Sequence, residues 1–235
     1  MPPIHAIFFD IGDTLVYDHP PLRERLAIAA RSSGLRLEDK HLPAAFRVGE
    51  AYAVERYVQG VPWDDYNALR ESLRRVLWAL CLPPLDEAGW VSLVQTFAGI
   101  PFERCAHPEA IALLAELKQR GFLVGAISDW ETTLPDLLTE LGLAPYFDVV
   151  AVSATFGVTK PNPRLFQEAL RQANAAPETS LHVGDWYELD VCGARAAGMQ
   201  TLLFDWPGRC PDADCPRVTT FAELFAYLLA LPCPK

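Results

Sequence analysis

The sequence lacks any long uncharged apolar run. A membrane-spanning helix needs about 18 such residues, and the densest apolar stretch, at 224–231, is much shorter. The first residues also lack the basic start and apolar centre that a secretory signal shows. We therefore expect a soluble, cytoplasmic protein that has no membrane partner.

Cysteine and basic side chains are also scarce. Six cysteines are spread over 235 residues without the compact spacing of a disulfide framework, so we expect reduced thiols. Cys210, Cys215 and Cys233 are too few and too widely spaced to favour a structural zinc site. Lys and Arg number 20 against 30 Asp and Glu, which gives a formal charge of -10. Such a charge repels phosphate backbones, so no nucleic-acid partner is expected.

The sequence does have the composition of a chain that buries a core, with 51% hydrophobic and 21% charged residues. Helical periodicity fills residues 21–97, whereas strand and helix patterns alternate after residue 98. Such alternation predicts a parallel sheet wrapped by helices on both faces. We therefore predict an α/β, doubly wound, Rossmann-like core formed by residues 1–15 and 98–235. An all-helical cap is predicted to be inserted at 16–97.

Polar side chains are expected where the strands of this sheet end. The predicted strands are 4–9, 123–127, 149–152, 180–183 and 201–204, and the predicted helices after residue 98 are 108–120, 133–141, 163–173 and 187–198. Asp10, Ser128, Lys160 and Asp185 each follow one of these strands. Ligands of open parallel sheets bind at the carboxyl ends of the strands. We therefore expect these four side chains to share one rim.

Four short motifs contain these residues. They read DIGDT at 10–14, SDW at 128–130, GVTKPNP at 157–163 and GDWYELD at 184–190. In this order and at these spacings they resemble the four motifs of the haloacid dehalogenase superfamily. The resemblance extends over nearly the whole core, and segments 160–166 and 182–199 resemble a branch of small hydrolases within it. It implies a hydrolase whose α/β core carries a cap, and the cap is expected to close over the rim and select the substrate.

The resemblance implies a role for the first and last motifs. Asp10 would be the nucleophile, which splits one displacement into two through a covalent intermediate. Magnesium would be bound by Asp10, by the main-chain carbonyl of Gly12 and by Asp185, because hard oxygen ligands suit this ion. Asp190 would either hold Lys160 or support the metal from outside its ligand shell.

The resemblance also implies how a substrate would be held. Thr14 and Ser128 would donate hydrogen bonds to phosphoryl oxygens, and Lys160 would place a positive charge between nucleophile and phosphoryl group. Ser128, Asp129 and Lys160 form the predicted substrate-binding set. Asp129 either contacts the loop or caps the helix that follows it, and capping is the favoured interpretation.

Gly12 departs from the superfamily pattern. Phosphatases of this superfamily carry a second Asp there, which protonates the leaving alcohol and then activates water. The absence of this Asp is expected to slow hydrolysis of alkyl phosphates by at most about 10²–10⁴-fold. The leaving groups of aryl and acyl phosphates depart without a proton, so the first step on these substrates does not need the acid. Asp13, one residue later, replaces that acid only through an unusual loop conformation or a water relay. Its other interpretation is a cap of the turn.

His182 and three aromatic residues lie beside these motifs. His182 stands in an apolar strand, which favours a buried, hydrogen-bonded histidine over a metal ligand. Trp130, Trp186 and Tyr187 either line the substrate entrance or pack against the helical insertion.

The leading functional hypothesis is a magnesium-dependent phosphatase that acts on a small phosphorylated metabolite through an aspartyl phosphate. The first alternative is a dehalogenase-type hydrolase with the same nucleophile, which explains Gly12 but not Asp185. A phosphonate hydrolase would need a lysine from the insertion, where Lys40 is the only one. The second alternative is a catalytically weak binding protein on the same fold. The sequence determines neither the substrate nor the oligomeric state.

Overall fold

The chain divides into two compact units. The computed structural model describes residues 2–63 and 65–234. A core unit consists of Met1–Tyr17 together with Cys105–Lys235, and a helical unit consists of Asp18–Arg104. The chain passes between them through two paired strands, β2 (Val16–His19) and β3 (Glu103–Ala106). The sequence does not predict these strands, because four residues of mixed polarity show no clear alternation.

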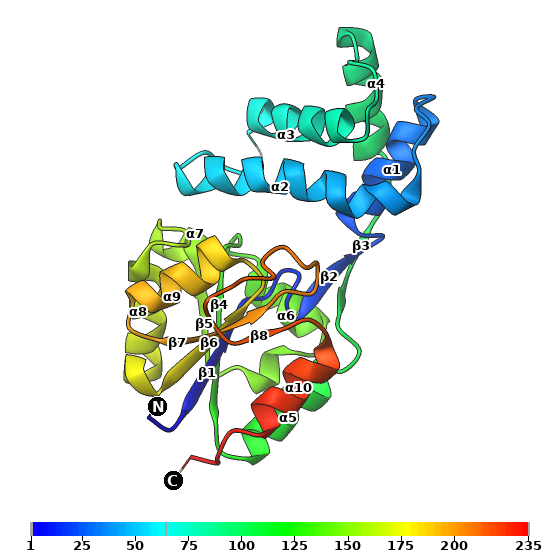
Figure 1. Cartoon of the computed structure of the whole chain (residues 1–235). Coiled ribbons are helices and arrows are strands. Elements are labelled where there is room, and N and C mark those ends of the chain that lie inside the picture. Colours follow the sequence, from blue (N-terminus) through cyan, green and yellow to red (C-terminus); the bar gives the residue numbers. More distant parts are fainter. Residues whose placement is uncertain (1, 64, 235) are drawn as a thin grey trace. The chain divides into compact units, whose positions relative to one another are not determined.

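A six-stranded parallel sheet forms the centre of the core unit, with the order β5-β4-β1-β6-β7-β8. Its strands are β1 (Ala6–Phe9), β4 (Leu123–Ser128), β5 (Val149–Val152), β6 (Ser180–Gly184), β7 (Gln200–Phe204) and β8 (Arg217–Val218). Strand β1 therefore lies between two strands that follow it by more than a hundred residues (Figure 1). This arrangement confirms the predicted doubly wound α/β fold.

Helices cover both faces of this sheet, with α8 and α9 on one face and α5 and α10 on the other (Figure 1). The helices of the core unit are α5 (Ala110–Gln119), α6 (Leu134–Glu140), α7 (Ser153–Phe156), α8 (Pro163–Ala173), α9 (Cys192–Ala196) and α10 (Phe221–Leu229). Successive side chains of a strand point to opposite faces. Accordingly Phe8 joins the cluster under α8, and Phe9 joins the cluster under α5 and α10.

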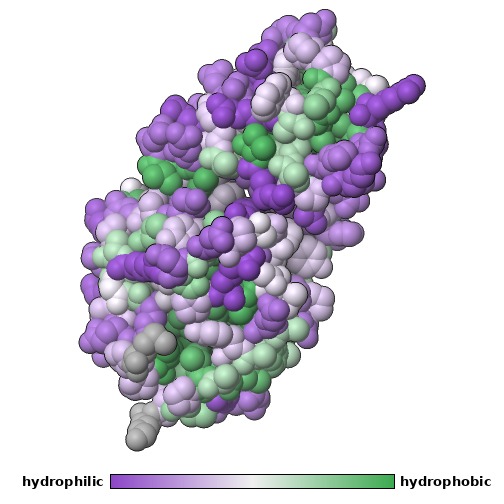
Figure 2. Space-filling view, in the orientation of Figure 1, coloured by the Kyte–Doolittle hydropathy of each residue, from purple (hydrophilic) through white to green (hydrophobic). Residues whose placement is uncertain are grey.

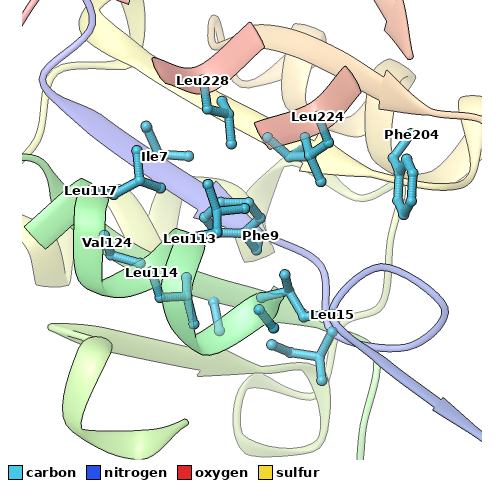
Figure 3. Close-up of a cluster of buried hydrophobic side chains, with 14 of the residues drawn as sticks. Ile7, Phe9, Leu15, Leu113, Leu114, Leu117, Val124, Phe204, Leu224 and Leu228 are labelled. Atoms are coloured by element: carbon cyan, nitrogen blue, oxygen red, sulfur yellow. The ribbon is translucent and has the colours of Figure 1, made fainter. Parts of the chain in front are cut away.

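Apolar packing anchors the strand that ends in front of Asp10. Ile7 and Phe9 of β1 are fully buried in the cluster that also holds Leu113 of α5 and Leu224 of α10 (Figure 3). Full burial of one such side chain stabilises a fold by about 1.5–3 kcal/mol. The carboxyl end of β1 is therefore held rigidly, and Asp10 follows it directly.

The helical unit contains α1 (Leu22–Ser32), α2 (Leu42–Val58), α3 (Tyr66–Ala79) and α4 (Glu87–Ala98). It has a small core of its own, in which Leu26, Leu77 and Leu93 are buried. Among the described residues, the large hydrophobic side chains that stay exposed lie in this unit apart from Ile111. Figure 2 shows hydrophobic surface in green among hydrophilic surface in purple on both parts of the chain. No helix in the described parts of the chain is long and apolar enough to cross a membrane.

Candidate active site

Four polar side chains are buried at the carboxyl end of the sheet. Asp10 follows β1, Ser128 ends β4, and Asp185 follows β6, while Lys160 lies in the loop between α7 and α8. Their functional groups come together although the residues are far apart in sequence. The predicted rim therefore exists as a single cluster of polar and charged groups.

Lys160 links two carboxylates. Its Nζ donates to Asp10 Oδ1 at 2.6 Å and to Asp190 Oδ1 at 2.7 Å, and Ser128 Oγ donates to the same Asp10 oxygen at 3.1 Å. Burial raises the pKa of Asp10, and the Lys160 charge opposes that shift. Burial would lower the pKa of Lys160, but the charges of Asp10 and Asp190 raise it above its usual value. Lys160 therefore stays protonated beside Asp10.

Asp190 approaches Lys160 from a π-helical turn at Tyr187–Val191. The prediction of one α-helix from residue 187 is wrong in its first turn, since α9 begins only at Cys192. The turn brings Asp190 Oδ2 within 3.0 Å of the Trp186 N–H that donates to it. A Cβ atom at Gly184 would lie 2.2 Å from Asp190 Cγ, so this approach requires glycine at position 184.

His182 is the second partner of the Asp190 carboxylate. Its Nε2 lies 2.9 Å from Asp190 Oδ1 and donates to it, because an ionised carboxylate can only accept. Burial lowers the pKa of His182, and Asp190 opposes this in part. The sequence-based interpretation as a buried histidine agrees with its 1% exposure, but its direct contact with the charged cluster was missed.

The two oxygens of the Asp185 carboxylate differ in their hydrogen bonding. Its Oδ2 accepts a hydrogen bond of 2.8 Å from Arg209 Nη1, whereas its buried Oδ1 has no hydrogen-bond partner among the described residues. Burial raises the pKa of Asp185 well above its usual range, and the Arg209 charge opposes that shift. One ligand atom each of Asp10, Asp185 and Asp190 lies within 4.8 Å of the others.

These oxygens fit a hard divalent cation. Both oxygens of Asp190 already accept hydrogen bonds, from Lys160, His182 and the Trp186 N–H. Asp185 offers a ligand atom within 4.8 Å of Asp10, and its buried, unpartnered Oδ1 is the oxygen that a cation would satisfy.

The loop after β1 carries Gly12, Asp13 and Thr14. Asp13 is exposed and adopts a left-handed backbone with φ of 54°, and its N–H donates to Val16 O at 2.7 Å. Thr14 is buried, and its Oγ1 has no partner within the described residues. A Cβ atom at Gly12 would lie 3.5 Å from the Trp130 ring, which is an ordinary contact. The loop therefore has room for a Cβ atom at position 12.

Comparison with known proteins identifies the family of this fold and site. A family model described as haloacid dehalogenase-like hydrolase matches residues 4–198. The chain belongs to the haloacid dehalogenase-like hydrolases. This confirms the resemblance drawn from the four motifs, and it establishes the chain as a hydrolase.

Curated relatives of this hydrolase span most of its length. Haloacid dehalogenase-like hydrolase domain-containing protein 3 of Homo sapiens is 33% identical over 214 residues, which cover 87% of this chain and 83% of that protein. Glyceraldehyde 3-phosphate phosphatase of Methanothermobacter thermautotrophicus is 32% identical over 203 residues, 85% of each chain. Phosphoserine phosphatase of Thermus thermophilus is 30% identical over 251 residues, 93% of this chain and 97% of the relative.

Solved structures share the fold of this hydrolase. A HAD-hydrolase from Bacillus subtilis bound to magnesium has a TM-score of 0.65 at 18% identity, covering 97% of this chain and 100% of that one. The L-2-haloacid dehalogenase RSc1362 has a TM-score of 0.65 at 20% identity, with the same coverage. At these identities the likeness concerns the fold alone.

In this haloacid dehalogenase-like hydrolase the site differs from the predicted one at two residues, Asp129 and Arg209. The Asp129 carboxylate accepts the Lys160 backbone N–H at 3.1 and 3.2 Å. Because α6 begins only at Leu134, after Thr133 at its N-cap, the helix-capping interpretation of Asp129 is wrong. Arg209, in the loop after β7, was missed entirely. The signal that points to it is its place just beyond the carboxyl end of a parallel strand.

Proposed function

We propose that this hydrolase is a magnesium-dependent phosphatase of a small phosphorylated metabolite, and that it works through an aspartyl phosphate on Asp10. The observation that carries the proposal is the Asp10 carboxylate held between Ser128 and Lys160, next to the unpartnered oxygen of Asp185. The phosphatase names of the relatives from Methanothermobacter and Thermus support the same reaction class. Six free cysteines are in keeping with a cytoplasmic location.

In the first step an oxygen of Asp10 attacks the phosphorus atom of the substrate. The bond between phosphorus and the ester oxygen breaks, and the electron pair leaves with that oxygen. Lys160 keeps its proton and reduces the repulsion between the carboxylate and the phosphoryl oxygens. Thr14 Oγ1 donates a hydrogen bond to those oxygens, and Ser128 Oγ does the same when its hydroxyl turns from Asp10 Oδ1 to the substrate.

In the second step water attacks the phosphorus atom of the aspartyl phosphate and releases inorganic phosphate with the Asp10 carboxylate. Gly12 offers no side chain to protonate the leaving group or to activate this water. Substrates whose leaving group departs as an anion are therefore favoured, and the aspartyl phosphate is long-lived. Asp13 supports the turn through its left-handed backbone and does not replace the absent acid.

Magnesium would be held by Asp10, by Asp185 and by the main-chain carbonyl of Gly12. When bound, it supplies positive charge that neutralises the phosphoryl oxygens during transfer. Asp190 holds Lys160 in place and stays outside the metal's ligand shell, because its oxygens are already engaged. Asp129 supports substrate binding through the Lys160 loop, whose backbone N–H it accepts.

A dehalogenase-type reaction is the second candidate, and Gly12 is the observation that favours it, since a halide leaves without a proton. The buried Asp185 opposes it. A carboxylate that costs desolvation is expected to have a use, and a metal-free displacement of halide gives it none.

The test is mass spectrometry of the protein after mixing with magnesium and acetyl phosphate. A phosphate adduct is expected on Asp10 of the wild type and is expected to be absent from Asp10→Asn. Turnover of an aryl phosphate and release of halide from a 2-haloacid are measured in parallel. The absence of both adduct and phosphate turnover, together with halide release, would establish the dehalogenase instead. The absence of every activity would support the binding-protein alternative.

A further inference from the structure

Arg209 is a cation that the fold places directly on a candidate metal ligand. Its Nη1 lies 2.8 Å from Asp185 Oδ2, with side-chain exposures of 11% and 1% for the two residues. Its guanidinium carbon lies 3.8 Å from the centre of the Trp186 ring. Stacking on an aromatic face together with a charge-assisted hydrogen bond fixes a guanidinium in one orientation.

The loop after β7 is built to hold Arg209 in this position. The buried Asp205 carboxylate accepts the backbone N–H groups of Arg209 at 2.6 Å and of Cys210 at 2.9 Å. Arg217 Nε donates to the same carboxylate at 2.8 Å. Three donors converge on one buried carboxylate, so the loop that carries Arg209 is well ordered and does not have to be organised by a ligand.

Arg209 changes the balance of buried charge in the cluster. When ionised, Asp10, Asp185 and Asp190 carry three negative charges, and Lys160 offsets one of them. Arg209 offsets a second and pairs with the carboxylate that Lys160 does not reach. Without it, Asp185 would be a buried anion with no opposite charge in hydrogen-bond contact, which is a strongly destabilising arrangement.

We infer that Arg209 is the protein's own counter-cation for Asp185, and that it lowers the affinity of the site for magnesium. This inference rests on the magnesium site of the proposed function. Arg209 uses Oδ2 and leaves Oδ1 for the metal, so the two cations share one carboxylate and repel each other. Arg209 thus keeps the site folded before the metal arrives, and the metal binds against a positive charge.

The experiment is calorimetric titration of the substrate-free protein with magnesium chloride, together with melting temperatures with and without the ion. Arg209→Met removes the charge but keeps an unbranched apolar side chain, and Arg209→Gln is a second neutral variant. Both are expected to bind magnesium about tenfold or more tightly than the wild type. Without magnesium, both are also expected to have a lower melting temperature than the wild type. Adding magnesium is expected to raise their melting temperatures by more than it raises that of the wild type.

Arg209→Lys separates charge from shape, because it keeps the positive charge and loses the planar guanidinium. It is expected to bind magnesium with nearly the wild-type constant. Arg195→Met is the matched control, since Arg195 forms an exposed pair with Asp214 at 2.7 Å in the same part of the fold. It is expected to leave the constant unchanged.

Three outcomes overturn the inference. Equal or weaker magnesium binding by both neutral variants would mean that Arg209 does not oppose the metal. Tighter binding by Arg209→Lys to the same extent would mean that packing and not charge is responsible. No magnesium binding by the wild type or any variant would remove the metal site itself. The aspartyl phosphate on Asp10 is detected separately, so failure of the inference and failure of the proposed reaction are distinguishable.

Discussion

The Lys160 ammonium group lies 2.6 Å from Asp10 Oδ1, although 150 positions separate the two residues. The same Nζ lies 2.7 Å from Asp190 Oδ1. A buried lysine between two carboxylates neutralises charge that the fold would otherwise have to bury uncompensated. The stability of this part of the fold therefore depends on these three side chains, which the proposed reaction also uses.

Replacement Lys160→Met is expected to destabilise the fold by about 3–5 kcal/mol, because it leaves Asp10 and Asp190 without their buried cation. Urea unfolding measures this. Lys118→Met is the control, since Lys118 pairs with Asp148 at a partly exposed position and should cost about 0–1 kcal/mol. Equal losses of unfolding free energy in the two variants would show that the buried Lys160 contributes no more to stability than the partly exposed Lys118.

Replacement Gly12→Asp is expected to speed hydrolysis of alkyl phosphates by up to about 10²–10⁴-fold, because it restores a general acid and base. Aryl phosphates should gain less, and the phosphate adduct on Asp10 should become short-lived. A Cβ atom at position 12 would make only an ordinary contact with Trp130. Gly12→Asn is the control, which adds similar volume without a titratable group. Equal acceleration by Asn would exclude acid-base catalysis as the cause.

Replacement Asp13→Asn tests whether the neighbouring acid already does this work. Asn tolerates the left-handed backbone of position 13, so the turn should persist. We expect turnover of an aryl phosphate to change by less than about tenfold, since a general acid or base contributes about 10²–10⁴-fold. A loss within that larger range, with an unchanged melting temperature, would assign the acid role to Asp13.

Replacement Thr14→Val should separate catalysis from stability. The Thr14 hydroxyl is buried and has no partner within the described residues, so its removal is expected to be neutral or to stabilise the fold by about 1 kcal/mol. If Oγ1 donates to the phosphoryl group, kcat should fall by about 10²-fold or more. Thr139→Val, at an exposed helix position, serves as the control. Unchanged turnover in Thr14→Val would exclude the hydroxyl from the reaction.

The buried His182 predicts how stability depends on pH. Because burial lowers its pKa in the folded protein, the unfolded chain takes up a proton as pH falls below about 6.5 while the folded protein does not. Stability is therefore lost on the acid side, by up to about 1.4 kcal/mol per pH unit. His182→Gln keeps a donor toward Asp190 and cannot titrate.

Free energies of unfolding of wild type and His182→Gln, measured at pH 7.5 and 5.5, check this prediction. Between pH 7.5 and pH 5.5 the free energy of unfolding should fall more for the wild type than for His182→Gln. Partial burial also lowers the pKa of His107, but this residue is present in both proteins and cancels in the comparison. Parallel losses in the two proteins would show that His182 does not contribute.

The fold was largely predictable because its signals are local. The predicted strand at 149–152 and helix at 163–173 coincide with β5 and α8, and both are read from the periodicity of a few adjacent residues. Three of the four motifs stand at strand ends for the same reason, whereas α7 separates β5 from the motif that contains Lys160. That Asp10, Ser128 and Lys160 come together followed from a general property of parallel sheets, whose carboxyl ends share one edge.

What only the tertiary structure decided are the partners of particular atoms. Arg209 donates a hydrogen bond to Asp185, and the Lys160 backbone N–H donates one to Asp129. A π-helical turn brings Asp190 within hydrogen-bond distance of His182. Each contact depends on how loops from different strands are placed, and no periodicity within one segment encodes that placement. The sequence by itself determined the fold class, the family and the types of groups at the rim. The folded chain decided which oxygen of Asp185 remains without a partner, because that depends on burial and on side chains brought together from separate loops.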